Sequence, residues 1–252
     1  MALNFRHALV TGGGSGIGKA IAEALAQAGV TVTICGRRVE ALNAVAEGNP
    51  NIHVQVADVT DEDSVTQLYE RAQAARGPFD IVIANAGMAV SAPAGKTSLD
   101  LWQQTMNVNL TGAFLSVRPA VDTMRKAGGG RIVFIASIAG LKGAPYISAY
   151  VASKHGVVGL TRALAAELAH TEITVNAICP GYVETPMLER TVANIVAKTG
   201  RDEDSARAAV TKDNPQGRII TPQEVADTVL WLCGDGARSV TGQAIAMAGG
   251  EA

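Results

Sequence analysis

Tyr150 and Lys154 are the residues whose types and spacing most directly suggest chemistry. On a helix, two residues four positions apart lie on one face and can reach a shared ligand. A cation beside a phenol favours the phenolate and lowers the phenol pKa from about 10, so the hydroxyl can exchange a proton near neutral pH. Tyr-x-x-x-Lys alone is more often a solvated surface pair. The interpretation therefore depends on its companions, which include Asn109 and Ser137 upstream.

A glycine-rich turn near the start of the chain is the second candidate site. It has the pattern Thr11-Gly12-x-x-x-Gly16-x-Gly18 and joins an apolar run, His7–Val10, to a helical pattern. Glycines let backbone amides approach a pyrophosphate closely, and a helix N-terminus favours its negative charge. Any tight strand-to-helix turn also favours glycine, so the pattern is informative only because a strand precedes it and a helix follows it. Its spacing also departs from the common G-x-G-x-x-G.

Apolar runs alternate with helical patterns along the chain, and these elements must position the candidate residues. The runs are apolar throughout rather than alternating with polar residues, which is typical of strands covered on both faces. Seven runs are expected to be strands: His7–Val10, Val30–Cys35, Ile52–Val56, Ile81–Ala84, Arg131–Ala136, Ile173–Cys179 and Ala244–Ala248. This alternation predicts a single-domain α/β fold over residues 1–252, a Rossmann-like doubly wound parallel seven-stranded sheet with helices on both faces.

The segment from Gly181 to about Gln216 interrupts this rhythm with polar, partly helical sequence. Its length suits a lid over the substrate, expected at about 183–216. A surface insertion without a role is the alternative. The helix that follows has a clear start, because Thr221-Pro222-Gln223-Glu224 is a capping box with proline at the first helical position.

Composition excludes several classes of protein. The chain is 48% hydrophobic and 17% charged, which fits a globular protein, and its net charge of −2 argues against a nucleic-acid partner. No apolar run is long enough to span a membrane, and the N-terminus does not resemble a signal peptide. Cys35, Cys179 and Cys233 suggest neither a disulfide framework nor a metal site, so we expect a cytoplasmic protein without a metal.

In order along the chain, these motifs resemble those of the short-chain dehydrogenase/reductase family, in its single-domain branch. The resemblance covers essentially the whole chain, and seven ordered motifs at suitable spacing make chance agreement negligible. The motifs are Thr11-Gly12-x-x-x-Gly16-x-Gly18, Asp58-Val59, Asn85-Ala86-Gly87, Asn107-Val108-Asn109-Leu110, Ser137, Tyr150-x-x-x-Lys154 and Pro180-Gly181-x-Val183-x-Thr185.

The resemblance implies roles for four catalytic residues. Tyr150 would be the general acid in reduction and the general base in oxidation. Ser137 would hydrogen-bond the substrate oxygen, where preorganised donors stabilise the charge that builds up. Lys154 would bind the nicotinamide ribose and lower the Tyr150 pKa, and Asn109 would hold a water in a proton relay to Lys154.

The resemblance also implies contacts with a nicotinamide dinucleotide. Asp58 would accept a hydrogen bond from the adenine amino group, although a carboxylate before a helix also serves as a cap. The implied cofactor-binding residues are Gly12, Gly14, Ser15, Gly16, Ile17, Gly18, Arg37, Arg38, Asp58, Val59, Asn85, Ala86, Gly87, Tyr150, Lys154, Pro180, Gly181, Val183 and Thr185.

The end of the second strand bears on cofactor choice. An acid there would bind the adenosine 2′-hydroxyl of NAD, but this chain has Cys35-Gly36-Arg37-Arg38. Two guanidinium groups suit a 2′-phosphate, so NADP(H) is favoured and NAD(H) is the alternative. Arg37 and Arg38 could also be merely solvated, or Arg37 could stack on the adenine of either cofactor. Ser15 argues against NADP(H), because many NADP-dependent relatives carry a basic residue there.

The expected reaction interconverts a ketone and a secondary alcohol. The stretch Ala152–Met187 is similar to aromatic polyketide ketoreductases, 3-oxoacyl reductases and 3-hydroxybutyrate dehydrogenases, so a 3-oxoacyl or other β-keto substrate is expected. A nucleotide-sensing regulator without turnover is an alternative that the intact catalytic set disfavours. A nucleotide-sugar epimerase of a longer branch is disfavoured by the short chain.

Assembly is predicted from helices that are apolar on more than one face, at about 98–124 and 150–169. A single sheet can bury only one such stripe per helix, so the remainder should pack against another subunit. Relatives commonly pair these two helices, which implies a homotetramer with two-fold axes or a dimer built on the same helices. A thick helical layer without a partner is the alternative.

Overall fold

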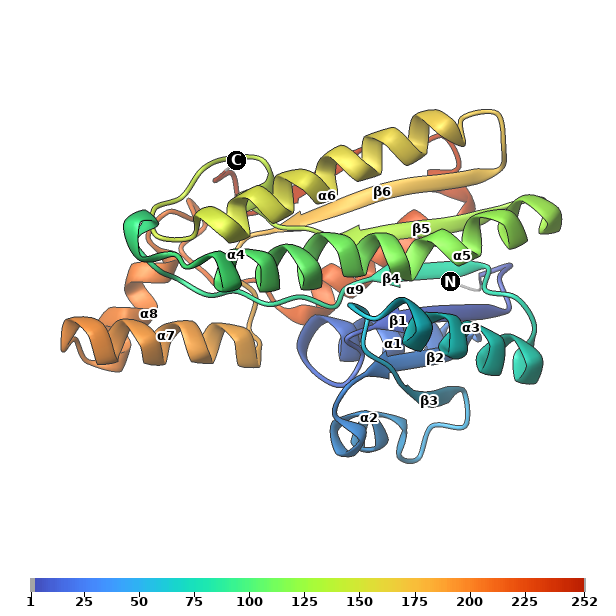
Figure 1. Ribbon diagram of the computed structural model, residues 1–252, viewed down its shortest axis with the longest axis horizontal. Helices are drawn as coiled ribbons and strands as arrows, with labels where there is room; N and C mark the ends of the chain where they lie inside the picture. Colours follow the sequence, from blue (N-terminus) through green and yellow to red (C-terminus); the bar gives the residue numbers. More distant parts are fainter. Residues whose placement is uncertain (1–2, 252) are drawn as a thin grey trace.

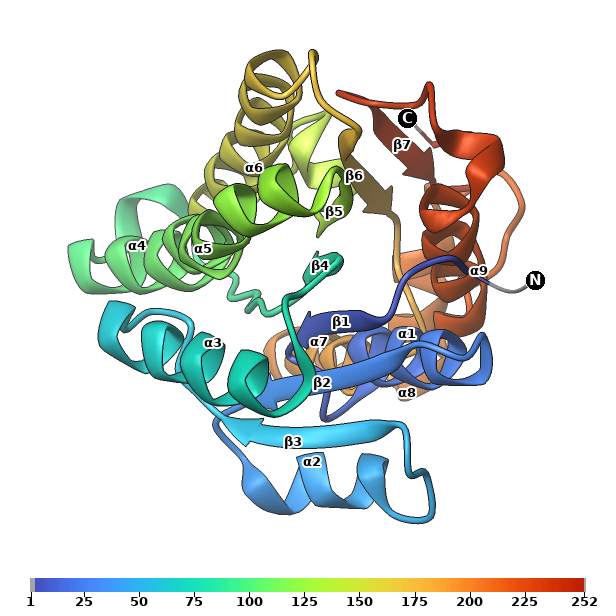
Figure 2. The ribbon, with the colours of Figure 1, turned by 90° about the vertical axis from the view of Figure 1, so that its right-hand side faces the viewer.

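The computed structural model describes residues 3–251, and within them one seven-stranded parallel sheet runs in the order β3-β2-β1-β4-β5-β6-β7 (Figures 1 and 2). The strands are β1 (His7–Thr11), β2 (Thr31–Gly36), β3 (Ile52–Val56), β4 (Ile81–Ala84), β5 (Gly130–Ile135), β6 (Ile173–Pro180) and β7 (Ala244–Met247). The predicted fold class is confirmed, and each expected strand lies within one or two residues of its position.

Helices connect the strands and cover both faces of the sheet. The α-helices are α1 (Gly16–Gln27), α2 (Val39–Ala46), α3 (Glu62–Arg76), α4 (Leu99–Met106), α5 (Gly112–Ala127), α6 (Ser148–Glu167), α7 (Pro186–Thr199), α8 (Glu203–Thr211) and α9 (Pro222–Cys233). The short helical turns are η1 (Ala94–Lys96), η2 (Asn107–Thr111), η3 (Ile138–Gly140) and η4 (Asp235–Ala237). In Figure 2, α3, α5 and α6 lie on one side of the sheet and α1 and α9 on the other.

Two hydrophobic clusters explain why the strands are apolar throughout. Ala8 and Val10 of β1 pack into the cluster shared with α1, α2 and α9. Leu9, between them, packs into the cluster shared with α3, α5 and α6. All three side chains are fully buried, because successive residues of a strand point to opposite faces and both faces are covered.

The strand order creates a crevice at the carboxyl ends of the central strands β1 and β4. β1 pairs with β2 on one side and with β4 on the other, so the connections leave β1 and β4 in opposite directions. In an open α/β sheet this switch point, at the carboxyl ends of the strands, is where ligands bind.

The predicted helix at about 98–124 is interrupted. α4 and α5 are separated by η2, a turn of π-helix that includes Asn109. A π turn inserts a residue into the helical repeat and changes which side chains face inward. Next to it, a Cβ on Gly112 would lie 2.8 Å from Cγ2 of Val59, so glycine permits the close packing found here.

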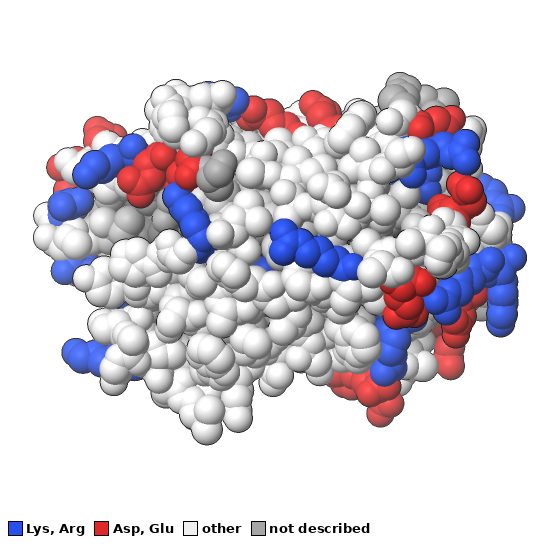
Figure 3. Space-filling model, turned by 90° about the horizontal axis from the view of Figure 1, so that it is seen from above, with Lys and Arg blue, Asp and Glu red and all other residues white. Residues whose placement is uncertain are grey.

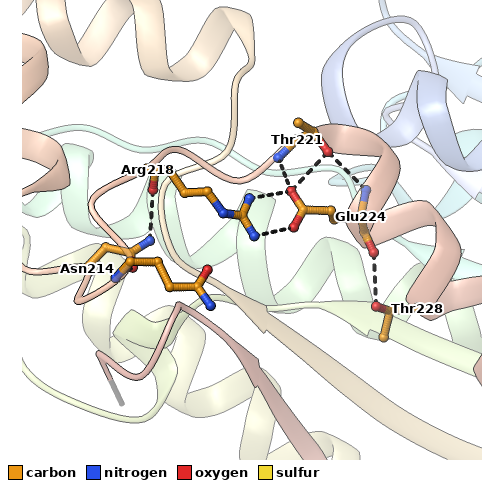
Figure 4. Close-up of polar contacts among 6 residues, drawn as sticks. Asn214, Arg218, Thr221, Glu224 and Thr228 are labelled. Atoms are coloured by element: carbon orange, nitrogen blue, oxygen red, sulfur yellow. Dashed lines mark hydrogen bonds and ion pairs between the residues drawn. The ribbon is translucent and has the colours of Figure 1, made fainter.

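Helices α7 and α8 lie beyond the end of the sheet (Figure 1), within residues 183–216, and the role of this segment as a lid stays a prediction. They pack on each other through a small cluster of Leu188, Val192, Ala206 and Val210. Behind them, Arg218 pairs with Glu224 at 2.7 and 2.8 Å, and Glu224 completes the capping box with Thr221 (Figure 4). The capping box predicted at Thr221 is therefore confirmed.

The surface above α6 carries few charges (Figure 3), and charged side chains gather towards its margins. Large hydrophobic side chains on neighbouring helices remain exposed, including Leu99, Trp102 and Phe114. Within residues 3–251, no helix is both long and apolar enough to cross a membrane.

Candidate active site

A cleft of about 310 Å³ opens at the carboxyl ends of β1, β2 and β4 and is bounded by the first turn of α7. The glycine-rich turn forms its floor. Gly12 and Gly16 have φ angles of +66° and +54°, a left-handed conformation that favours glycine. A Cβ on Gly18 would lie 2.3 Å from the carbonyl oxygen of Gly12, so Gly18 lets α1 pack directly against the turn. The bare backbone suits the phosphates of a dinucleotide.

Most of the predicted cofactor residues line this cleft. They are Gly12, Gly14, Ser15, Gly16, Ile17, Arg37, Arg38, Asp58, Val59, Asn85, Ala86, Gly87, Tyr150, Lys154 and Thr185. Four others do not: Gly18 packs beneath the turn, Pro180 ends β6, Gly181 lies against Ala248, and Val183 is buried in a bridge to Ile220.

Asn85 holds the glycine-rich turn in place. Its Nδ2 donates to the carbonyl oxygens of Thr11 at 2.8 Å and Gly12 at 3.3 Å. In return, the Thr11 hydroxyl accepts from the backbone N–H groups of Asn85 and Ala86, both at 3.0 Å. The carboxyl ends of β1 and β4 are thereby tied together directly beneath the cleft.

Tyr150 and Lys154 come from α6 and reach the far end of the cleft. Lys154 is buried, and its Nζ donates to the carbonyl oxygen of Ile135 at 2.8 Å. The same Nζ lies 5.7 Å from the centre of the Tyr150 ring. Ser137 follows β5, and its hydroxyl accepts from the backbone N–H of Ala139 at 3.1 Å. The predicted tyrosine, lysine and serine therefore converge.

The expectation that Lys154 lowers the Tyr150 pKa is not met in the protein alone. Burial raises the pKa of Tyr150 above its usual value, and a hydrogen bond with Ser137 opposes the rise only in part. Burial also lowers the pKa of Lys154 to about 8. The physical reason is that both groups lose water, while the lysine ammonium is directed at Ile135 rather than at the phenol oxygen.

Asn109, buried in η2, joins three parts of the site. Its Oδ1 accepts from the backbone N–H of Met88 at 2.8 Å. Its Nδ2 donates to the carbonyl oxygen of Met88 at 2.9 Å and to the Ser153 hydroxyl at 3.0 Å. These bonds fix the loop after β4 against α6. Asn107, two residues earlier, lies outside the cleft and borders a separate polar hollow beside Arg37.

Charge at the other end of the cleft comes from the residues after β2. Arg37 is largely exposed, and its Nη1 lies 3.9 Å from Oδ2 of Asp58. Asp58 accepts from the backbone N–H of Thr60 at 3.0 Å and from its hydroxyl at 2.8 Å. Burial acts to raise the pKa of Asp58, but these hydrogen bonds and the Arg37 charge lower it overall. Asp58 therefore shapes its own loop and also faces the cleft.

Several lining residues were not predicted from the sequence. Met88 and Val108 line the cleft from the loop after β4 and from η2, while Pro186, Met187 and Arg190 do so from α7. The contact between α7 and the glycine-rich turn joins segments far apart in the chain, so spacing alone carried no signal for it. Among the described residues, no group of three His, Cys, Asp or Glu side chains could hold a metal ion.

Comparisons with known proteins agree with this geometry. A family model described as short chain dehydrogenase matches residues 6–195. The chain is 36% identical to a D-beta-hydroxybutyrate dehydrogenase of Rhizobium meliloti (strain 1021), over 97% of this chain and 98% of that protein. It is 40% identical to a monensin polyketide synthase putative ketoacyl reductase of Streptomyces virginiae, over 97% and 96%.

The similarity extends to solved structures. The crystal structure of a variant of actinorhodin polyketide ketoreductase with NADPH matches with a TM-score of 0.95 at 37% identity, covering 100% of this chain and 99% of that one. A levodione reductase matches with a TM-score of 0.92 at 33% identity, covering 98% and 97%.

Proposed function

Because this chain belongs to the short-chain dehydrogenase family of oxidoreductases, we propose that it interconverts a ketone and a secondary alcohol with a nicotinamide cofactor. The observation that carries the proposal is that Tyr150 and Lys154 line one end of a cleft whose floor is the glycine-rich turn, with Ser137 hydrogen-bonded to Tyr150. The same set disfavours a silent nucleotide-sensing regulator, which would not need it.

The residues of the cleft fit a dinucleotide. Glycine-rich backbone and the N-terminus of α1 offer donors to phosphates, Asp58 faces the adenosine end, and Lys154 lies at the opposite end. When bound, the cofactor supplies or removes the hydride. The protein therefore has to hold the substrate oxygen and move one proton.

Tyr150 is the proposed proton donor in reduction. Its hydroxyl is protonated at neutral pH, as a proton donor must be, but burial raises its pKa and makes it a weak acid in the protein without cofactor. Ser137 would donate a hydrogen bond to the same substrate oxygen as negative charge develops on it. Lys154 would orient the nicotinamide ribose and, with its pKa near 8, exchange protons within the physiological range.

NADP(H) is the proposed cofactor, with NAD(H) as the alternative. Arg37 and Arg38 both line the cleft where an acid would otherwise select NAD(H). The matching polyketide ketoreductase structure is described as containing NADPH. We expect Arg37→Ala to raise the KM for NADPH selectively, and a native preference for NADH would contradict the assignment.

A β-keto or 3-oxoacyl compound is the proposed substrate, because relatives are named ketoacyl reductases and hydroxybutyrate dehydrogenases.

The assembly proposed is a homotetramer, or a dimer built on the same surface, because the face over α6 carries few charges (Figure 3). Light scattering tests the assembly, and a mass near the monomer's 25.9 kDa at micromolar concentration would contradict it.

The test of function is consumption of NADPH or NADH, followed by nicotinamide absorbance, against a panel of ketones that includes 3-oxoacyl thioesters. We expect turnover with at least one β-keto compound and faster turnover with NADPH. A protein that bound either cofactor but reduced no ketone, and oxidised no corresponding alcohol, would overturn the proposal.

A further inference from the structure

The first turn of α7 touches the glycine-rich turn. A Cβ on Gly16 would lie 3.0 Å from Cγ2 of Thr185 and 3.7 Å from Cδ of Pro186. Thr185 is the N-cap of α7 and Pro186 its first residue. The lid therefore begins against the part of the cleft whose backbone suits a pyrophosphate.

Arg190, an exposed residue of the same helix, also lines the cleft. It lies four residues after Pro186, so both residues share one face of α7, and both line the cleft. Within residues 3–251, the structure records no ion pair or hydrogen bond for its guanidinium. The neighbouring acids of the lid do not neutralise it, because Glu184 and Glu189 both pair with Arg207.

The described residues that line the cleft carry a net positive charge, which favours an anionic ligand. Asp58 is the single carboxylate among the described lining residues, which also include the cations Arg37, Arg38, Lys154 and Arg190. Arg37 lies beside Asp58 at the adenosine end, and Lys154 is fixed on Ile135 at the Tyr150 end. Arg190 is the lining cation contributed by α7, the helix whose first turn touches the glycine-rich turn.

The N-terminus of α1 lacks a charge or cap of its own. Ser15 makes no side-chain capping hydrogen bond, and the first turn of α1 contains no acidic residue. The donors at this helix end and Arg190 line the same cleft, and the only carboxylate among the described lining residues is Asp58. A pyrophosphate can accept from both at once.

We propose that Arg190 is a cofactor-binding residue that donates hydrogen bonds to the pyrophosphate of the dinucleotide and so holds α7 closed over it. The inference rests on the proposed use of a nicotinamide dinucleotide. It assigns Arg190 to a group that NADPH and NADH share, whereas Arg37 and Arg38 face the group that distinguishes them.

The test compares Arg190→Met with Arg201→Met, a matched change at an exposed arginine past the far end of α7. Dissociation constants for NADPH, NADH and ADP are measured by fluorescence titration or calorimetry without a ketone. For Arg190→Met we expect all three to weaken by a similar factor of about ten-fold, the size of one lost charge-assisted hydrogen bond. Arg201→Met should leave all three unchanged.

Three results would overturn the inference. Weaker binding of NADPH alone would place the guanidinium at the 2′-phosphate. Unchanged dissociation constants with a raised KM for the ketone would place it at the substrate. An equal loss of nucleotide affinity in Arg201→Met would indicate a general effect of the positive charge of this segment, with no specific contact from Arg190.

Two controls keep the test decisive. Should Arg190→Met unfold, Arg190→Gln gives a smaller polar replacement, and the native melting temperature is the criterion for a valid variant. A wild-type protein that bound neither nucleotide would overturn the proposed function itself, whereas wild-type binding with an unaffected Arg190→Met would overturn this inference alone.

Discussion

The carboxyl ends of the strands (the carboxyl edge) and the proposed lid, residues 183–216, border one cleft but are stabilised in different ways. The edge is held by buried strands and by buried hydrogen bonds, such as those of Lys154 with Ile135 and of Asn109 with Ser153. The lid has a small apolar cluster of its own and exposed ion pairs centred on Arg207. Exposed pairs contribute little to stability, so we expect the proposed lid to open more readily than the sheet.

This difference separates two tasks. The groups that we propose to exchange the proton need fixed positions, because small displacements of reacting groups are costly in rate. A segment that covers a substrate and its cofactor must open to admit and release them. The comparison therefore predicts that changes at the sheet edge affect the chemical step or global stability, and that changes at the lid affect binding and local opening.

The largest expected effect is that of Tyr150→Phe, at the end of the cleft to which α6 contributes. The change removes only the hydroxyl, so the fold should stay native and the cofactor should still bind through its other contacts in the cleft. Turnover should fall by about 10²-fold or more, since no other group replaces the proton donor. Steady-state kinetics together with cofactor titration measure both quantities. A near-native kcat would show that Tyr150 is not the general acid.

The second effect tests how tightly the edge is packed. In Gly18→Ala, the new methyl group would lie 2.3 Å from the Gly12 carbonyl oxygen and 2.5 Å from Nδ2 of Asn85. Overpacking of this kind should lower the free energy of unfolding by about 1–3 kcal/mol and displace the turn that faces the cofactor. Chemical denaturation and cofactor titration measure the two effects.

Gly95→Ala is the control for this experiment, because a Cβ on Gly95 would meet no atom within 4 Å. Its free energy of unfolding should stay within about 0.5 kcal/mol of the native value. Equal destabilisation of the two variants would show that the contact between α1 and the glycine-rich turn is looser than the structure indicates.

The sequence predicts the edge better than the lid, for a physical reason. Strand positions follow from apolar runs, and Gly12 and Gly16 follow from the turn geometry that glycine alone adopts easily. Arg190 could not be predicted as a lining residue, because its place in the cleft depends on how α7 packs against the glycine-rich turn. The raised pKa of Tyr150 was missed because it depends on burial, which spacing along a helix does not reveal.

The break in the helix at Asn109 shows the same limit on a smaller scale. The amphipathic pattern predicts one helix, and the π turn shifts the register so that Asn109 faces Met88 and Ser153. Gly112, packed against Val59, allows the shifted helix to approach the neighbouring loop. Such a turn depends on tertiary contacts, so the amphipathic pattern of the sequence does not predict it.

The smallest expected effect concerns the ion pair of Arg218 and Glu224, which follows the proposed lid. Asn214, at the end of that segment, donates to the carbonyl oxygen of Arg218 at 2.8 Å (Figure 4). Glu224→Gln keeps the shape of the side chain and its place in the capping box but removes the charge that pairs with Arg218 (Figure 4). Hydrogen bonds from Arg218, and after them from Thr221, lower the pKa of Glu224 from 4.5 to about 2. A carboxylate with a lowered pKa stabilises the folded state above its unfolded pKa, and this contribution is lost as the pH falls towards the folded value.

At neutral pH the variant should therefore be less stable by about 1 kcal/mol, a modest figure because the pair is partly exposed to solvent. The difference between the wild-type protein and Glu224→Gln should shrink as the pH falls from 4.5 towards 2, because the native carboxyl group then becomes protonated as well. Free energies of unfolding measured over this range test the sign. Limited proteolysis of residues 183–216 should also be faster in the variant at neutral pH, with unchanged cleavage elsewhere. A stability difference that stayed constant with pH would show that the charge of Glu224 does not stabilise the folded protein through its pairing with Arg218.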